Sequence, residues 1–149
     1  MIFSQKTKYG IQAALYMVIY EKEAFFSTKH ISEEMGISYS YLTKIVKELS
    51  DAGILKTTRG KGGGLRLAKP ARQISLKDIL LALENSEYFE TCMLGFSVCE
   101  PGDVCVCSDT LREIDERIYE FLESSTLQDL AHGNHVGHMR LSKALTLAM

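Results

Sequence analysis

Residues 36–70, GISYSYLTKIVKELSDAGILKTTRGKGGGLRLAKP, place a short amphipathic helix before a basic hairpin. The apolar face of the helix has the i, i+3, i+4, i+7 spacing, through Leu42, Ile45, Val46 and Leu49. Two strand-like segments then flank a glycine-rich tip, RGKGGG at 59–64, which predicts a β-hairpin. A helix followed at once by a basic hairpin is typical of the second half of a winged helix-turn-helix.

A second short helix precedes this stretch, in STKHISEEMG at 27–36. Ser27 or Thr28 can accept hydrogen bonds from its first amides, and Gly36 can end it in the left-handed conformation. Residues 6–20 are densely apolar and predict a helix buried on most of its sides. The fold class is therefore expected to be mostly α, with a winged helix-turn-helix and a small β-hairpin wing over residues 1–72.

The helix that begins after Ser38 leaves one face free for a partner. In a winged helix-turn-helix this helix enters the major groove, and its N-terminal turn contacts base edges and phosphates. The glycines of the tip allow close approach to a backbone, and its cations suit phosphates or a narrow minor groove. The candidate DNA-binding residues are Ser38, Tyr39, Ser40, Tyr41, Thr43, Lys44, Lys47, Arg59 and Lys61.

Each of these signals is weak on its own. The helix could be an ordinary amphipathic helix, and RGKGGG an ordinary loop. A nucleotide-binding loop is disfavoured, because the segment lacks the G-x-x-x-x-G-K-[ST] order. Helix, turn, helix and wing in this order, within a basic half of the chain, together favour binding to double-stranded DNA.

Charge divides the chain into two halves. Residues 1–75 contain 12 Lys and Arg against 6 Asp and Glu, a net +6, whereas residues 76–149 contain 5 against 13, a net −8. This division predicts that one end of the protein meets a polyanion. No apolar run approaches the roughly 20 residues of a membrane span, and the start lacks a secretory signal. We therefore expect a cytoplasmic protein with no membrane partner.

Beyond the hairpin, the chain predicts further helices. Ser75 can cap a helix, which makes residues 73–90 a connecting segment. Residues 109–131 predict two more helices, the last of which Thr126 and Asp129 can cap. The first of these two has an apolar stripe that needs a partner, through Leu111, Ile114, Ile118, Phe121 and Leu122.

Two remaining segments are harder to place in the fold. Residues 91–108 predict a loop, and residues 132–149 are a tail of unknown structure. His132, His135 and His138 in this tail could bind a metal, although a mobile tail is the simpler interpretation.

All four cysteines fall within TCMLGFSVCEPGDVCVC, residues 91–107. The chain is long enough to fold without disulfides and cytosolic thiols stay reduced, so metal binding or redox chemistry is favoured. The gaps between Cys92, Cys99, Cys105 and Cys107 do not favour zinc, whose ligand pairs are usually two to four residues apart. The alternatives are an iron-sulfur cluster, a redox-active disulfide and buried reduced thiols.

The run at 36–70 and CMLGFSVC at 92–99 resemble the Rrf-type family of bacterial transcription regulators, which includes IscR, NsrR, RirA and CymR. The resemblance extends from the first helix through the 108–131 region, and its most specific marks are SYL, RG-x-GGG and the cysteine pattern. It implies a homodimer that binds operator DNA through Tyr41 and its neighbours, with Arg59 in the minor groove. It also implies that the helix at 109–124 is a dimerisation helix, with residues 109–131 as the dimerisation region.

The resemblance assigns a sensing role to the 91–108 loop. Many members of the family hold an iron-sulfur cluster whose state alters DNA binding. The matching pattern in this chain makes Cys92, Cys99 and Cys105 the implied cluster ligands. The nuclearity of the cluster is not predicted, and a protein without a cluster is the alternative.

The fourth cluster ligand departs from the family pattern. Ser108 stands where many relatives have a histidine three residues after the third cysteine. Other relatives supply a ligand from the partner's first helix, where this chain has Lys8, Tyr9 and Gln12. Cys107 is therefore our candidate, with Asp109 or an outside small molecule as the alternatives.

Three functional hypotheses follow. The favoured one is a homodimeric transcription regulator whose operator binding responds to a cluster in the cysteine loop. The second keeps the DNA-binding module but senses through oxidation of Cys105 and Cys107. The third, suggested by CymR-like relatives, is an interaction module that regulates a metabolic enzyme through the 109–124 helix. An enzyme is not predicted, because no nucleophile with a nearby base is apparent and His30 stands alone.

Overall fold

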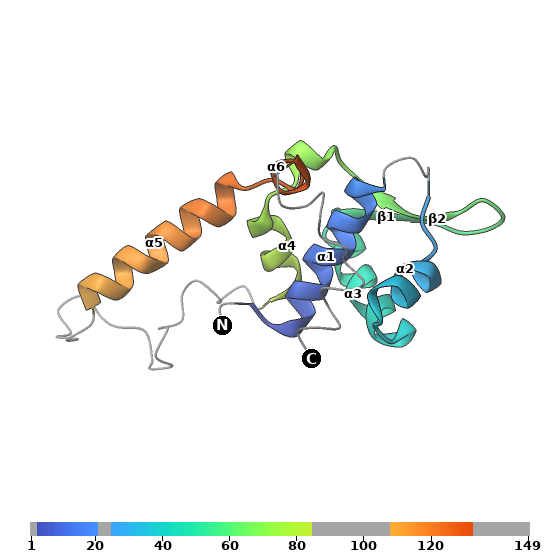
Figure 1. The fold of residues 1–149 in the computed structure, drawn as a ribbon, viewed down its shortest axis with the longest axis horizontal. Helices are drawn as coiled ribbons and strands as arrows, with labels where there is room; N and C mark the ends of the chain where they lie inside the picture. Colours follow the sequence, from blue (N-terminus) through green and yellow to red (C-terminus); the bar gives the residue numbers. More distant parts are fainter. Residues whose placement is uncertain (1–2, 21–24, 85–107, 133–149) are drawn as a thin grey trace.

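A computed structural model describes residues 3–20, 25–84 and 108–132 (Figure 1). Its first part contains α1 (Gln5–Ile19), α2 (Thr28–Met35), α3 (Tyr39–Asp51), β1 (Leu55–Thr58) and β2 (Gly64–Leu67). A short 3-10 turn, η1 (Ala71–Gln73), leads to α4 (Leu76–Leu83), α5 (Ser108–Ser124) and α6 (Leu127–His132). A mostly helical chain with a two-stranded antiparallel sheet confirms the predicted fold class.

The ends of α2 and α3 are set by the residues that the sequence indicated. Ser27 accepts a hydrogen bond from the amide of His30 at the start of α2, and Ser38 accepts one from the amide of Tyr41 at the start of α3. Gly36 ends α2 at φ 65°, a left-handed conformation that a residue without a Cβ adopts readily. The turn between the two helices is therefore encoded locally.

The core lies between α1, α3 and α4. The α3 side chains predicted to be apolar and inward-facing are all buried, including Leu42 and Ile45 at 0% exposure. Gly10 of α1 lies against this layer so closely that an added Cβ would collide with Leu83 of α4. A side chain at this crossing would therefore force the buried Leu83 side chain to move, because α1 and α4 approach closely here.

The hairpin packs through one of its two faces. Leu55 pairs with Leu67, and Thr57 pairs with Leu65, in an antiparallel register. Leu55 and Leu65 are buried, and Leu65 exchanges two backbone hydrogen bonds with Phe26, at 2.7 and 2.8 Å. The wing therefore joins the body through its inner face and through the segment just before α2.

The last helix closes the core of the first half of the chain. The amide of Leu127 donates to the carbonyl of Ile74, and the amide of Leu76 donates to the carbonyl of Ser125, both at 2.9 Å. The Leu127 side chain is fully buried in the same core as α1 and α3. Because these contacts join residues about fifty positions apart, α6 belongs to the body around the winged helix-turn-helix.

Helix α5 projects from this body, with its C-terminal end next to α4 (Figure 1). Leu122 is fully buried against Leu76 and Leu80. Two other residues of the predicted stripe, Ile114 and Phe121, are 42% and 53% exposed. Only part of the apolar stripe is thus covered within one chain. None of the described helices is long and apolar enough to cross a membrane.

Lys77 braces the junction between α4 and α5. Its ammonium group forms an ion pair with Glu123 at 2.8 Å and lies 4.1 Å from the centre of the Tyr119 ring. The ammonium also donates a hydrogen bond to the Tyr119 hydroxyl. Contacts with two residues one helical turn apart restrain the angle at which α5 leaves the body.

Candidate nucleic-acid interface

The first turn of α3 presents hydroxyl groups to solvent. Ser38, Tyr39, Ser40 and Tyr41 are all exposed, with Tyr39 at 57%. Ser38 satisfies the amide of Tyr41 at 3.3 Å, so the start of the helix keeps its form before any partner arrives. An exposed helix N-terminus with hydroxyls around it can contact phosphates or base edges.

The rest of the exposed face of α3 carries polar and basic groups. Thr43 donates its hydroxyl hydrogen to the carbonyl of Tyr39 at 2.7 Å. Lys47 pairs with Asp51 at 3.2 Å, and Lys44 is exposed. The Tyr41 ring packs edge-on against Tyr9 of α1, with centroids 6.0 Å apart. This ring contact restrains one tyrosine of the candidate surface, whereas Tyr39 extends freely.

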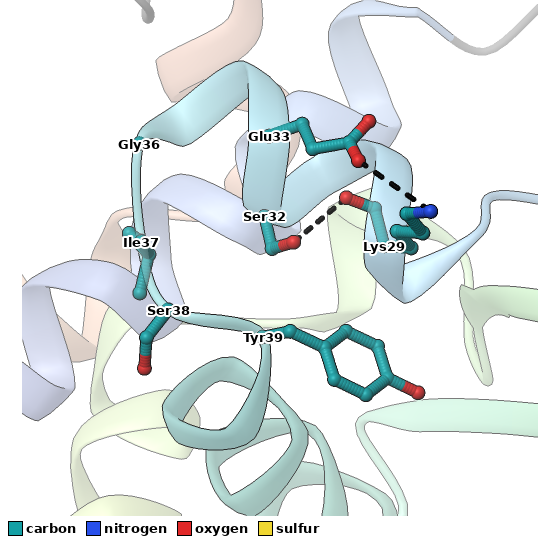
Figure 2. Close-up of a pocket in the computed structure, with 7 residues that line it drawn as sticks. All are labelled: Lys29, Ser32, Glu33, Gly36, Ile37, Ser38 and Tyr39. Atoms are coloured by element: carbon teal, nitrogen blue, oxygen red, sulfur yellow. Dashed lines mark hydrogen bonds and ion pairs between the residues drawn. The ribbon is translucent and has the colours of Figure 1, made fainter.

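A hollow of about 680 Å³ lies beside this helix start (Figure 2). It is bordered by α2, the Gly36–Ser38 turn and Tyr39. Figure 2 shows the Tyr39 ring extending along the hollow, below Lys29 and Ser32 of α2 in this view. Lys29 and Glu33 form an ion pair at 3.9 Å on its far side. Both helices of the helix-turn-helix therefore contribute to one concave surface.

The tip of the wing has the backbone that its glycines predict. Gly60 and Gly62 have φ values of 100° and 84°, which L side chains rarely adopt. A Cβ on Gly63 would collide with the carbonyl oxygen of Thr58. Arg59 and Lys61 are exposed in this tight turn, where their charges lie beyond the bulk of the body.

Sequence reasoning missed two cations on the strands of the same hairpin. Lys56 of β1 lies directly opposite Arg66 of β2, and both are exposed. A signal for them was present, because the chain contains seven Lys and Arg but no Asp or Glu between Asp51 and Asp78. Strand alternation then places Lys56 and Arg66 on the face opposite the buried leucines.

A polar cluster joins the start of α1 to the ends of α3 and α4. The fully buried hydroxyl of Thr7 donates to the Glu84 carboxylate at 2.5 Å, and the Ser4 amide donates to the same oxygen at 3.3 Å. Lys6 pairs with Glu48 of α3 at 2.9 Å. Burial raises the pKa of Glu84, but the hydrogen bonds from Ser4 and Thr7 and the charge of Lys6 outweigh it, so the pKa is lowered.

The predicted cluster ligands cannot be placed. Cys92, Cys99, Cys105 and Cys107 lie outside the described residues, as do His135 and His138. Among the residues that the structure describes, no three His, Cys, Asp or Glu side chains come together as a metal site.

Three other positions considered for a metal site, the alternatives Asp109 and His132 and the disfavoured Gln12, do lie within the described ranges. The Asp109 carboxylate is exposed and pairs with Arg112 at 3.5 Å. His132 contacts the carbonyl of Gln128 at 2.7 Å. On α1, the Gln12 side-chain oxygen is buried without a hydrogen-bond partner among the described residues.

An exposed polar helix after a tight turn, seated on two others and followed by a basic hairpin, defines a winged helix-turn-helix DNA-binding regulator. Residues 3–133 match the family described as "Rrf2: Iron-dependent Transcriptional regulator". The chain belongs to this Rrf2 family. It is 32% identical over 136 residues to the HTH-type transcriptional regulator IscR of Photorhabdus laumondii, covering 91% of this chain and 82% of IscR.

Solved structures support the same assignment. IscR of T. potens is 31% identical with a TM-score of 0.73, over 92% of this chain and 90% of that one. The oxidized form of Staphylococcus aureus CymR is 29% identical with a TM-score of 0.68, over 87% of this chain and 94% of that one. The relatives are named as transcriptional regulators, a class of protein that is not enzymatic.

Proposed function

We propose that the chain is a homodimeric, cytoplasmic regulator whose binding to operator DNA responds to an iron-sulfur cluster held by the cysteine loop. The observation that carries this proposal is the position of that loop in the chain. All four cysteines fall between α4, which packs on α1 and α3, and α5, which projects from the body. The loop is thus joined through the chain to both the DNA-binding body and the projecting helix, so a change in the loop can affect both.

The exposed part of α5 supports the homodimer. Ile114 and Phe121 lie seven residues apart, two helical turns along one face, and both are largely exposed. A second copy of α5 would bury this face in a self-complementary contact. Two bodies related by such a contact would place two copies of α3 in successive major grooves, with operator half-sites about one helical turn apart.

The donor set fits an iron-sulfur cluster, which thiolates hold and which supplies a redox-sensitive group when bound. Cys92, Cys99 and Cys105 are the proposed ligands, and Cys107 is the proposed fourth. Asp109 is the alternative, because its exposed carboxylate lies at the start of α5. Regulation requires that the cluster-bound and cluster-free proteins differ in DNA affinity, since a group without differential binding shifts no equilibrium.

Anaerobic purification followed by iron and sulfide analysis, an absorbance spectrum and operator titrations tests this proposal. We expect stoichiometric iron and sulfide, lost in Cys92→Ala, Cys99→Ala and Cys105→Ala, with a changed operator affinity. Cys107→Ser and Asp109→Asn separate the candidates for the fourth ligand. Cys107→Ser should destabilise the cluster if the thiolate is the ligand, whereas Asp109→Asn should do so if the carboxylate is the ligand. Unchanged operator binding in all three alanine variants would refute cluster sensing while leaving DNA binding intact.

Thiol oxidation is the second candidate function. It is favoured by the similarity to an oxidized form of CymR and by the close spacing of Cys105 and Cys107. In this case the purified protein would contain no iron, and an oxidant would form a disulfide that a reductant reverses. Operator affinity should then follow the oxidation state in the wild type and be insensitive to it in Cys107→Ser.

A further inference from the structure

Lys56 and Arg66 form a cationic pair on the outer face of the wing. The antiparallel register places them directly opposite one another, with side chains that project from the face that does not pack on the core. Directly opposed residues in such a pair have Cβ atoms about 4.5–5.5 Å apart. Two cationic side chains therefore start from neighbouring positions on the strands, separate from the tip.

The hairpin contains nothing that offsets this repulsion. Like charges directly opposite each other destabilise a strand pair. No Asp or Glu occurs between Asp51 and Asp78. Within the described ranges of the chain, no cation of the hairpin forms an ion pair. An anion bound between the two side chains would relieve the repulsion, whereas solvent alone only screens it.

The contact with Phe25 orients Arg66. Its guanidinium group lies over the Phe25 ring, 5.5 Å from the ring centre. A contact with a ring does not saturate the five N–H donors of a guanidinium, so donors of Arg66 remain for an acceptor. A side chain ordered in advance loses less conformational entropy when it binds. This arrangement suits the bidentate recognition of a phosphate group.

The pair also lies in line with the tip. Arg59 is three residues beyond Lys56, a distance of about 10 Å along an extended strand. Phosphates along one DNA strand recur about every 3.4 Å of helix axis. The strand face and the tip can therefore contact different phosphates of the same duplex at the same time.

We propose that Lys56 and Arg66 form a phosphate-binding site for the backbone of duplex DNA, next to the contacts made by α3 and the wing tip. This inference rests on the proposed operator binding. The site adds affinity without reading sequence, because phosphates carry no base information. It also widens the footprint of each protomer beyond the surface formed by the candidate residues of α3 and the tip.

The salt dependence of DNA binding tests the site. The probes are a duplex selected by the wild-type protein from a random-sequence pool and an unselected duplex, titrated over a range of salt concentrations. Each lost phosphate contact reduces the slope of log Kobs against log salt by about 0.9, so Lys56→Gln in both protomers of a dimer should reduce it by about 1.8. The Lys56→Gln/Arg66→Gln double variant should reduce it by about 3.6. The ratio of selected to unselected affinity should stay unchanged.

Two further variants, together with Lys56→Gln, keep the test decisive. Arg112→Gln removes the same charge from α5, where the side chain is 71% exposed, and should leave the slope unchanged. Arg66→Lys keeps the charge but loses the planar guanidinium and its contact with Phe25, so it should keep most of the slope and bind more weakly. Lys56→Gln leaves the Phe25 contact intact and so gives an answer even if Arg66→Gln fails to fold.

The possible outcomes separate this inference from the proposed function. A wild-type protein with no salt-sensitive affinity for either duplex would refute both. Normal wild-type binding with the same slope in Lys56→Gln and in the double variant would refute the phosphate site alone. In that case Arg66 would serve only to pack against Phe25.

Discussion

Replacing Thr7 by Val tests the polar cluster that holds the end of α4 against α1. The Thr7 side chain is fully buried, and its hydroxyl donates to Glu84 at 2.5 Å. Valine has nearly the same shape but no hydroxyl, so the variant removes this bond and the long one that Thr7 accepts from the Ser4 hydroxyl, at 3.4 Å, without opening a cavity. The Glu84 carboxylate would keep its interactions with Ser4, including the amide at 3.3 Å, and the nearby charge of Lys6.

The expected loss of stability follows from the kind of bond removed. A hydrogen bond to a charged group contributes about 1.5–3 kcal/mol to stability. Glu84 is partly exposed, so water can replace some of the lost bond, and we expect Thr7→Val to lower the free energy of unfolding by about 1–2 kcal/mol. For a chain of this size the melting temperature would fall by about 2–8 °C.

The effect should depend on pH in a defined direction. Because the pKa of Glu84 is lowered in the folded state, its contribution to stability is present above its ordinary value of 4.5. The contribution is lost as the pH falls through the folded pKa. The stability difference between wild type and Thr7→Val should thus be full at neutral pH and shrink in acid, as measured by urea denaturation followed by circular dichroism.

Thr43→Val is the matched control. The Thr43 hydroxyl also donates a short hydrogen bond, but it is exposed and bonds to the neutral carbonyl of Tyr39. We expect a change within about 0.5 kcal/mol, the same at neutral and acid pH. Equal denaturation midpoints for Thr7→Val and wild type at neutral pH would refute the role of the cluster. An equal loss at acid pH would refute the assignment to the ionised Glu84.

Three other substitutions test separate features. Gly10→Ala should lower the free energy of unfolding by about 0–2 kcal/mol, since the clash with Leu83 costs about 1–3 kcal/mol and helix propensity returns about 1 kcal/mol, and a variant more stable than wild type in urea would contradict this close crossing. Lys77→Met should leave a folded dimer, but α5 loses the contacts that restrain its angle to the body. Among duplexes with varied half-site spacing, the variant should therefore prefer a different spacing from wild type. An unchanged preference would contradict the role of Lys77 in orienting α5. Phe121→Glu should give a monomer in sedimentation velocity, whereas Glu116→Gln on the exposed surface should not, and a persistent Phe121→Glu dimer would exclude this face as the interface.

Much of the fold could be predicted from sequence because its signals are local. Ser27, Ser38 and Ser75 each cap a helix by accepting a hydrogen bond from an amide three residues ahead. Gly36 ends α2 for a reason that concerns its own backbone alone. The reciprocal contacts of Thr126 and Asp129 are likewise confined to four residues. Such features depend little on the rest of the chain.

Contacts between distant segments could not be predicted in the same way. Glu84 meets Ser4 and Thr7 across about eighty residues, and no periodicity in either segment indicates the other. Lys77 meets Tyr119 and Glu123 for an equally non-local reason. In the sequence, none of these residues stands out from other polar positions. Only the packing of α4 against α1 and α5 brings them together.

The apolar stripe of α5 was predicted as one surface, but the structure divides it. Leu122 is buried against α4, whereas Ile114 and Phe121 are exposed. A stripe wider than one contact can serve two partners, and sequence spacing alone does not tell which residues face which partner. The identities of the DNA contacts and of the cluster ligands stay predictions.

The docking of α6 has a consequence for how the protein is made. Leu127, fully buried in the core that supports α3, emerges from the ribosome only after residues 91–107. Nascent chains generally fold from the N-terminus onward, as cooperative units. The body that carries α3 therefore cannot reach its final packing until the whole cysteine segment has been synthesised. In the order of biosynthesis, every fully packed copy of the DNA-binding body already has its cysteines.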